Sequence, residues 1–257
     1  MKIISIMNQK GGVAKTTSTR NIAEVLKNEG NKVLLIDLDP QANLTSSFNI
    51  DKKVNNKTIY KLFKLQTEKK EYQIEDYLVD VNGIFLIPNN IRMSKADLEF
   101  GGFTSREHIL KKIMKNFTGE EFDYVLLDCP PALNLITYNA LSVSNKVYIP
   151  LEAESFSLEG IADMLDTINE VKEDLNESLE IGGVFITKFK KNTNLHLTIE
   201  KNIEKYFKEK ILKTRIRENI KVAESIAMKK SVVEYDKKSN GAKDYIALTK
   251  EIIKREE

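Results

Sequence analysis

The sequence predicts an α/β fold: a doubly wound, mostly parallel sheet with helices on both faces. Short apolar runs rich in Ile, Val, Leu and Phe recur along the chain, and longer segments between them repeat apolar residues about every 3.6 positions. Strands that alternate with helices need crossover connections, and these give a parallel sheet covered on both sides. The predicted strands are residues 2–8, 32–37, 83–88, 122–128, 146–151 and 181–188.

The prolines indicate which edge of this sheet carries function. Proline lacks an N–H and therefore ends strand pairing. All of the prolines fall at or just past the ends of predicted strands, so they mark one rim, and open α/β sheets bind ligands at that rim. They are Pro40, Pro88, Pro130, Pro131 and Pro150.

Helical spacing is clear in three segments. Residues 17–29 and 161–171 each repeat apolar side chains along one face, and residues 245–257 have the spacing of a helix that docks on its own sheet. Three aromatic residues are expected to pack in the core: Phe100, Phe103 and Phe117.

Length and composition favour a single globular domain. The chain has 257 residues, of which 41% are hydrophobic and 30% charged. No apolar run approaches the roughly 20 residues that span a bilayer. We expect one domain over residues 1–257, located in the cytoplasm, with the polar, lysine-rich residues 49–82 as a helical insertion. The single cysteine, Cys129, excludes an internal disulfide and a multi-cysteine metal site made by one chain.

The most informative segment is the glycine turn between the first strand and the first helix. Residues 10–17 read Lys-Gly-Gly-Val-Ala-Lys-Thr-Thr. A strand that ends in a glycine turn and opens a helix aims unpaired backbone N–H groups at one point, beside the positive end of the helix dipole. The turn therefore predicts a cradle for the phosphates of ATP, in which Lys15 contacts the β and γ phosphates and the Thr16 hydroxyl binds Mg²⁺.

This turn is a variant of the ordinary phosphate loop. Gln9 and Ala14 occupy the two positions where the usual pattern has glycine, whereas Lys15-Thr16 matches its ending. A second lysine, Lys10, stands at the front of the turn and has no role in the simple scheme.

Two predicted strands end in carboxylates. One ends in Asp128, as a Walker B strand does, and the other ends in the pair Asp37 and Asp39. Phosphoryl transfer needs a carboxylate that orients water and another near the Mg²⁺ shell, on the same rim as the phosphate loop. Residues 37 and 39 are two apart and point to the same side, so one or both are available to the water or the metal.

Charge is unevenly distributed although the net charge is only +2. Residues 151–180 hold 10 acidic and 1 basic side chains, a balance of −9, and residues 188–257 hold 19 basic and 11 acidic side chains, a balance of +8. Such asymmetry is compatible with a face that meets a polyanion and equally with solvated helix faces.

Taken together, these motifs resemble the ParA family of partition ATPases, in particular its short Soj-like members. The resemblance covers nearly the whole chain and is weakest between residues 49 and 82. Its motifs also occur in the wider deviant-Walker group, which includes MinD-type membrane ATPases and nitrogenase iron proteins. The matching segments are residues 8–17, 35–41, 127–131, 149–151, 156–160 and 235–242.

The resemblance implies a nucleotide-switched homodimer in which Lys10 crosses to the ATP of the partner subunit. It also implies that Asp39 orients the hydrolytic water, that Asp128 holds the Mg²⁺ shell, and that Asn219 lies beside the adenine. Residues around Gln41 and Asn43 would sense the γ-phosphate. The remaining nucleotide contacts fall on the loop and helix start: Gly11, Gly12, Val13, Ala14, Lys15, Thr16 and Thr17.

Family members of this kind bind nonspecific DNA as ATP dimers, which makes them nucleoid-associated, and a ParB-type centromere-binding partner stimulates hydrolysis and release. Hydrolysis by the isolated protein should be slow. Longer members carry a helix-turn-helix before the first strand, and we expect no such operator binding here. The cargo and the partner's identity are not encoded in these residues.

The sequence departs from the family at four positions. Ala14 replaces a glycine, and we expect it to fit a helical backbone there. Arg217 and Glu218 replace a proline near the adenine and an arginine used for DNA, and Asn192 replaces another arginine. Neighbouring cations could supply the phosphate contacts instead, because such contacts are independent of sequence. These candidate DNA-binding residues are Lys190, Lys191, Lys213, Arg215 and Lys221.

Two other functions share the fold. A MinD-like membrane-associated ATPase would need a basic amphipathic helix at the C-terminus, whereas residues 245–257 finish with acidic side chains. An ATP-dependent carboxylate ligase would need a substrate pocket. A nitrogenase-type reductase is excluded because it needs two cluster cysteines in each chain.

Overall fold

A computed structural model describes the chain except residues 52–55, 118–120, 153–157, 191–202, 204–205 and 257. Its centre is a sheet of eight strands in the order β3-β4-β2-β5-β1-β6-β7-β8. The strands are β1 (Lys2–Ile6), β2 (Val33–Asp37), β3 (Val79–Val81), β4 (Ile84–Ile87), β5 (Tyr124–Asp128), β6 (Lys146–Glu152), β7 (Glu180–Phe189) and β8 (Ile211–Arg217).

The sheet is parallel except at one edge, which confirms the predicted α/β class. β3 pairs antiparallel with β4, and every other neighbouring pair is parallel. All six predicted strands are present, with ends shifted by a few residues. Pro150 is an exception to the predicted rim, because β6 continues past it to Glu152 along β7. The missing N–H is tolerated there because pairing with β1 already ends at Tyr148.

Two strands were not predicted, and each left a signal in the sequence. Asn82 and Gly83 form the turn between β3 and β4, with φ of 55° and 82°. An Asn-Gly pair is a strong hairpin signal in a sequence. In β8, charged residues alternate with Leu212, Thr214 and Ile216, which is the two-residue period of a strand with one buried face. β3 lies within residues 49–82, so this segment contributes a strand as well as a helix.

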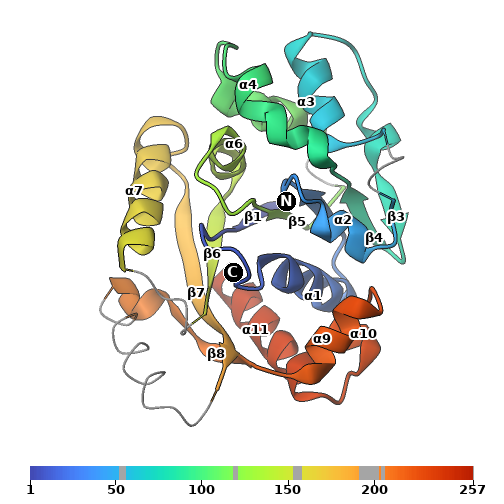
Figure 1. Cartoon of the computed structure of the whole chain (residues 1–257), viewed down its shortest axis with the longest axis vertical. Coiled ribbons are helices and arrows are strands. Elements are labelled where there is room, and N and C mark those ends of the chain that lie inside the picture. Colours follow the sequence, from blue (N-terminus) through green and yellow to red (C-terminus); the bar gives the residue numbers. More distant parts are fainter. Residues whose placement is uncertain (52–55, 118–120, 153–157, 191–202, 204–205, 257) are drawn as a thin grey trace.

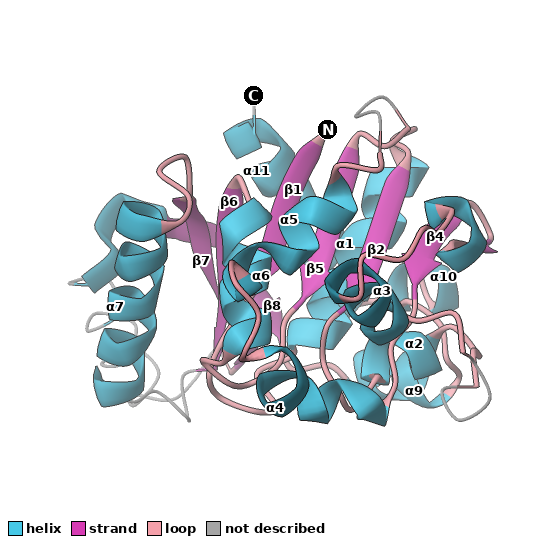
Figure 2. Ribbon diagram, turned by 90° about the horizontal axis from the view of Figure 1, so that it is seen from above, coloured by secondary structure: helices cyan, strands magenta, loops and turns pink. Residues whose placement is uncertain are grey.

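Helices cover both faces of the sheet (Figures 1 and 2). The helices are α1 (Lys15–Asn28), α2 (Asn43–Ser47), α3 (Ile59–Thr67), α4 (Ala96–Phe100), α5 (Ile109–Met114), α6 (Leu135–Val143), α7 (Leu158–Asp174), α9 (Ile220–Ala227), α10 (Val232–Tyr235) and α11 (Asn240–Glu256). Short 3-10 helices are η1 (Ile74–Tyr77), η2 (Ile91–Lys95), η3 (Arg106–His108) and η5 (Lys208–Lys210).

Strand residues alternate between the two layers. In β5, Val125 and Leu127 face the core formed with α3, α5, α6 and α7, whereas Tyr124 and Leu126 face the core formed with α1, α10 and α11. Burial on both sides explains why the strand is apolar at every position before Asp128. Figure 1 shows α3, α4 and α6 on one side of the sheet and α1 and α11 on the other.

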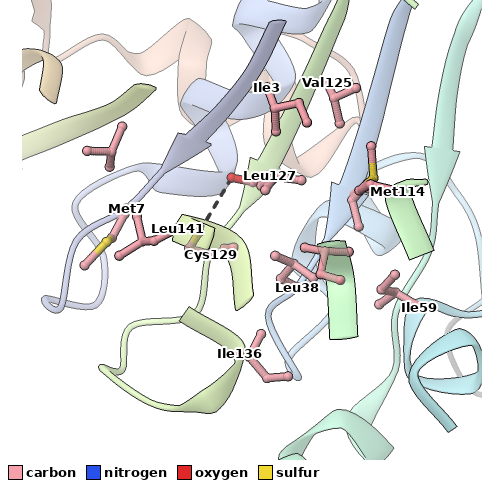
Figure 3. Close-up of a cluster of buried hydrophobic side chains, with 14 of the residues drawn as sticks. Ile3, Met7, Leu38, Ile59, Met114, Val125, Leu127, Cys129, Ile136 and Leu141 are labelled. Atoms are coloured by element: carbon pink, nitrogen blue, oxygen red, sulfur yellow. Dashed lines mark hydrogen bonds between the residues drawn. The ribbon is translucent and has the colours of Figure 1, made fainter. Parts of the chain in front are cut away.

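Cys129 lies in the first of these cores, just after β5. Figure 3 places it among Met7, Leu38, Leu127 and Ile136, and its thiol donates to the Leu127 carbonyl at 3.8 Å. Burial raises the pKa of the thiol to about 12. The cysteine is therefore a packing residue in its neutral form.

The aromatic residues did not all behave as predicted. Phe100 and Phe117 are buried, but Phe103 is 42% exposed. Phe103 lies in the loop after α4, where no repeating pattern fixes the direction of a side chain. Its prediction as a core residue was wrong.

Candidate nucleotide-binding site

The glycine turn connects β1 to α1 at the carboxyl end of the sheet. Gly12 adopts the left-handed region with φ of 79°, which glycine occupies without steric cost. Ala14 is also left-handed, with φ of 68° and ψ of 29°, immediately before the first residue of α1. The expectation that Ala14 fits a helical backbone was therefore wrong. The glycine of relatives would be relaxed here, and alanine carries about 1 kcal/mol of backbone strain.

Lys15 is buried at the start of α1, with 7% of its surface exposed. Its Nζ donates to the carbonyl of Lys10 at 3.0 Å, across the mouth of the turn. Burial lowers the pKa of Lys15, and the nearby Asp128 opposes that shift. The ammonium therefore reaches across the turn to a neutral carbonyl acceptor. A phosphate bound in the turn would offer it a stronger, charged acceptor.

Lys10 differs from Lys15 in its surroundings. Asn8 accepts a hydrogen bond of 2.8 Å from the Lys10 backbone N–H, and the Asn8 amide donates to the Pro150 carbonyl at 2.7 Å. These bonds fix the backbone of the turn, while the Lys10 side chain is exposed. The lysine at the front of the turn is therefore presented to solvent.

Thr16 and Asp128 meet directly. The Thr16 hydroxyl donates to the Asp128 carboxylate at 2.7 Å, and the Thr19 hydroxyl lies 3.4 Å from its other oxygen. Asp128 is fully buried, and burial followed by the neighbouring charge of Asp37 raises its pKa well above the ordinary value. Hydroxyl and carboxylate oxygens of this kind suit Mg²⁺.

Asp37 and Asp39 do different things although they are two residues apart. Asp37 is fully buried and accepts hydrogen bonds from the Thr45 backbone at 2.8 Å and the Thr45 hydroxyl at 2.6 Å. Burial raises its pKa to about 7. Asp39 is 8% exposed, accepts from the Gln41 N–H at 2.8 Å, and lines the adjoining cavity. Of the two, Asp39 is the one that faces the cavity.

A metal ion at Asp37 and Asp128 would need further oxygen ligands besides these carboxylates. Among the described residues, no group of three or more His, Cys, Asp or Glu side chains is arranged to hold a metal ion. Mg²⁺ typically takes one or two protein ligands and completes its octahedron with water and substrate phosphates. Thr16 and the buried carboxylates fit that pattern.

A cavity of about 520 Å³ runs from the glycine turn to the corner between β8 and α9. Polar residues of the turn and of residues 39–43 line one end, and apolar residues of β8, α9 and α11 line the other. This division suits a triphosphate at one end and a base at the other. The apolar lining is Ile216, Val222, Ala223, Ile226 and Tyr245.

Asn219 lies at the base end of this cavity, where it caps α9. Its side chain accepts from the Lys221 N–H at 2.9 Å. Arg217, two residues earlier, forms an ion pair with Asp244 of α11 at 2.6 Å, and its backbone N–H donates to the same carboxylate at 3.0 Å. Asp244 was not predicted, because nothing local in α11 marks it as a partner for β8.

Thr45 was also not predicted as a site residue. Its backbone N–H and its hydroxyl both donate hydrogen bonds to the same carboxylate oxygen of Asp37. Its hydroxyl oxygen also accepts from the Asn89 N–H at 2.9 Å, which joins the ends of β2 and β4. Nothing local in the sequence marks Thr45, inside α2, as the partner of Asp37; only the fold shows this contact.

The candidate DNA-binding cations gather around β8, but several have acidic neighbours. Lys190 lies 3.4 Å from Glu218, and Lys221 lies 2.8 Å from Glu224. Lys213 is exposed on the edge strand β8, and Arg215 of the same strand donates to the Lys213 carbonyl at 2.9 Å. Lys191, Asn192 and residues 156–157 of the family motif lie outside the described residues.

These features define a class of protein: the strand order, the turn before α1 and the buried carboxylates are those of a P-loop nucleotide-binding α/β protein. A model of the AAA domain family matches residues 1–181. The chain is 37% identical to the sporulation initiation inhibitor protein Soj of Bacillus subtilis over 98% of both chains. It is 36% identical to the chromosome-partitioning ATPase Soj of Treponema pallidum, over 99% of this chain and 98% of that protein.

Solved structures agree. A putative plasmid partition protein of Borrelia burgdorferi, bound to AMPPNP, superposes with a TM-score of 0.79 and 31% identity over 99% of this chain and 97% of that one. A cobyrinic acid a,c-diamide synthase of Mycobacterium smegmatis, with a bound ATP analogue and magnesium, gives a TM-score of 0.86 and 28% identity over 97% and 93%. The chain belongs to the ParA/Soj family of partition ATPases, as its motifs predicted.

Proposed function

We propose that this protein is an ATP-dependent DNA-segregation ATPase whose ATP-bound homodimer binds nonspecific DNA and is released when a ParB-type partner stimulates hydrolysis. It would act in the cytoplasm, associated with the nucleoid. The observation that carries the proposal is a cavity lined by Lys15 and Thr16 of the glycine turn and by Asn219, with the Thr16 hydroxyl bonded to the buried Asp128.

The cofactors are ATP and Mg²⁺. The backbone of Gly11 to Thr17 and the Lys15 ammonium would hold the phosphates, and the Thr16 hydroxyl would bind the metal, with Asp128 and Asp37 behind it. Mg²⁺ would neutralise charge that develops on the phosphates. Two structurally similar proteins support this assignment: the plasmid partition protein of Borrelia burgdorferi bound to AMPPNP, and the cobyrinic acid a,c-diamide synthase of Mycobacterium smegmatis with an ATP analogue and magnesium.

Asp39 would orient the hydrolytic water. It is the carboxylate that lines the cavity, and it sits at the start of residues 39–43, which lead into α2. Gln41 and Asn43 line the same cavity and would report the presence of the γ-phosphate through α2. Hydrolysis to ADP and phosphate would be slow until the partner completes the site.

Lys10 would bind the nucleotide of the second subunit. Its exposed side chain stands at the mouth of the turn, and its backbone is fixed by Asn8. A cation presented at the rim of the cavity suits charge-assisted contact with a phosphate brought by another copy. Dimerisation would therefore depend on ATP.

DNA binding would use the cations around β8. Lys213 and Arg215 lie two residues apart on this edge strand, and Lys190 and Lys221 lie near its carboxyl end. The acid neighbours Glu218 and Glu224 reduce the local field, which predicts modest affinity with a steep dependence on salt.

The membrane alternative has less support. The apolar residues Tyr245, Leu248 and Ile252 of α11 are buried against the sheet, so this face is not available to lipid. No helix among the described residues has the length and apolar character needed to cross a bilayer.

One experiment separates these functions. Fluorescence anisotropy with a labelled duplex, measured with ATP, with ADP and without nucleotide at two salt concentrations, should show ATP-dependent, sequence-independent and salt-sensitive binding. Liposome sedimentation with anionic lipid runs in parallel, and pelleting without DNA binding would instead indicate the MinD-like function. Turnover stimulated by a small carboxylic acid, with DNA having no effect, would indicate a ligase.

Charge reversal at Lys190 and Lys191 tests the proposed DNA-binding surface. Charge reversal at Lys237 and Lys238, another pair of adjacent lysines, is the control. The first variant should bind DNA more weakly and retain the ATP affinity of the monomer. Equal retardation of DNA by both variants would place the DNA surface elsewhere.

A further inference from the structure

A second cavity, of about 350 Å³, adjoins the nucleotide cavity on the far side of α1. It lies between α1, α2 and the turn that joins α9 to α10. It shares Thr16, Thr17, Asn43 and Ile226 with the nucleotide cavity, but neither Lys15 nor the two loop glycines lines it. Its own residues are Arg20, Asn21, Ser46, Ser47, Lys229 and Lys230.

Arg20 is the unusual member of this lining. It is 8% exposed, and its Nη atoms donate to the carbonyls of Ser47 and Lys229, while its guanidinium lies 4.1 Å from the centre of the Phe48 ring. Its Nε is buried and has no hydrogen-bond partner. In the part of the chain that the structure describes, no carboxylate lies within 4.0 Å of this cation.

A buried guanidinium held only by neutral groups is costly, because charge removed from water is normally compensated by an opposite charge. Burial accordingly lowers the pKa of Arg20, opposed by the more distant Glu234 and Glu24. An anion in the adjoining cavity would supply the missing compensation. Arg20 lines this cavity, so an anion there would lie beside the uncompensated charge.

The rest of the lining has the matching chemistry. Lys229 and Lys230 are exposed at the cavity, and the described lining residues include no Asp or Glu. Lys230 also lies 3.5 Å from Glu234, so Lys229 is the cation with the smaller competing charge. The Thr17 hydroxyl and the Asn43 amide add neutral donors that an oxyanion can accept from.

We propose that this cavity binds a small, free phosphate-bearing anion, separate from the phosphates held by the glycine turn. Arg20 and Lys229 are its principal charged contacts, and Lys230, Thr17 and Asn43 complete the cage. Because Asn43, Ser46 and Ser47 of α2 line the cavity, its occupant is in contact with that helix.

The test uses the full chain and two calorimetric titrations. The first adds a non-hydrolysable ATP analogue with Mg²⁺, and failure to bind there would contradict the proposed function. The second adds inorganic phosphate to protein already saturated with the analogue, at constant ionic strength. Saturable phosphate binding in this second titration is the result expected, because the glycine turn is then filled.

The variant is Lys229→Gln/Lys230→Gln, and the matched control is Lys237→Gln/Lys238→Gln, a second exposed pair of adjacent lysines. The first pair should weaken phosphate binding at least about fivefold, as expected for loss of charged contacts, and the control should leave it unchanged. Arg20→Gln should weaken it further. If that variant unfolds, the lysine pairs alone decide, because their side chains are exposed.

Two results would overturn the inference: no saturable phosphate binding by the parent, or equal weakening by both lysine pairs. If the parent binds no phosphate and Lys229→Gln/Lys230→Gln loses duplex DNA binding, these cations belong to a nucleic acid contact. The ATP-analogue titration stays informative in each case, so failure of this inference is distinguishable from failure of the proposed function.

Discussion

The Thr16 hydroxyl and the Asp128 carboxylate lie 2.7 Å apart although 112 residues separate them in the sequence. The bond joins the start of α1 to the end of β5, and it positions the hydroxyl that would bind Mg²⁺ beside the carboxylate that would hold the metal's water shell. Parallel pairing of β1 with β5 brings these two strand ends together. The following predictions test what this arrangement does.

Asp39→Ala should bind ATP with the affinity of the parent protein and lose turnover by about 100-fold or more, since a residue that orients water contributes mainly to the chemical step. Steady-state phosphate release and nucleotide titration measure the two quantities separately. Asp166→Ala, at an exposed position of α7, is the control. Parent-like hydrolysis by the Asp39 variant would show that another group orients the water.

Lys15→Gln should weaken nucleotide binding by about 100-fold, because the variant loses a buried charge-assisted contact to the phosphates. Isothermal titration with ATP and Mg²⁺ measures the loss. The variant should remain folded, since in the absence of nucleotide Lys15 bonds only the Lys10 carbonyl. Unaltered affinity would remove the glycine turn from the site.

Lys10→Ala should retain the ATP affinity of the monomer and lose ATP-dependent dimerisation, because in the proposed dimer the exposed side chain of Lys10 would contact the nucleotide of the second subunit. Light scattering with a non-hydrolysable analogue measures the oligomer. Lys32→Ala, at an exposed lysine beside β2, should dimerise normally. A stable dimer of the Lys10 variant would contradict the shared-nucleotide arrangement.

The nucleotide-free protein should lose stability as the pH rises from about 4 to about 7. Burial raises the pKa of Asp37 from 3.8 to about 7, so the folded state binds a proton more tightly than the unfolded state in this window. The stabilisation is complete below the unfolded pKa and is lost as the pH passes through the folded one. Thermal melting at pH 5 and pH 8 tests this.

The matched variants are Asp37→Asn, which should reduce that dependence without abolishing it because the pKa of the buried Asp128 is also raised, and Asp80→Asn, which should preserve it because Asp80 is exposed in the β3–β4 hairpin. A parent protein that melts at a higher temperature at pH 8 than at pH 5 would contradict the raised pKa of Asp37.

Arg217→Ala should weaken ATP binding about tenfold and leave binding of inorganic tripolyphosphate unchanged. The ion pair with Asp244 fixes the corner that carries Asn219, and this corner would contact the base and not the phosphates. Asp244→Asn should reproduce the effect, whereas Lys250→Ala on the same helix should not. Equal losses for both ligands would mean a general loss of folding.

The strand-end residues show how far local patterns reached. Asp128 and Asp37 were predicted because each follows an apolar strand, and the sheet places both at one edge, paired in register. Their different surroundings were not predictable. The Thr45 hydroxyl donates a hydrogen bond to Asp37, and the Thr16 hydroxyl donates one to Asp128. Both bonds connect separate elements of the fold.

The amino-acid sequence by itself determined the α/β class, the phosphate turn and the carboxylates at the ends of its strands, because hydrophobic period, glycine and proline act over a few neighbouring residues. Tertiary structure decided the left-handed backbone of Ala14, the pairing of Arg217 with Asp244, and the burial of Arg20 without a counter-charge. These depend on which distant elements the fold packs together, and no local pattern specifies that.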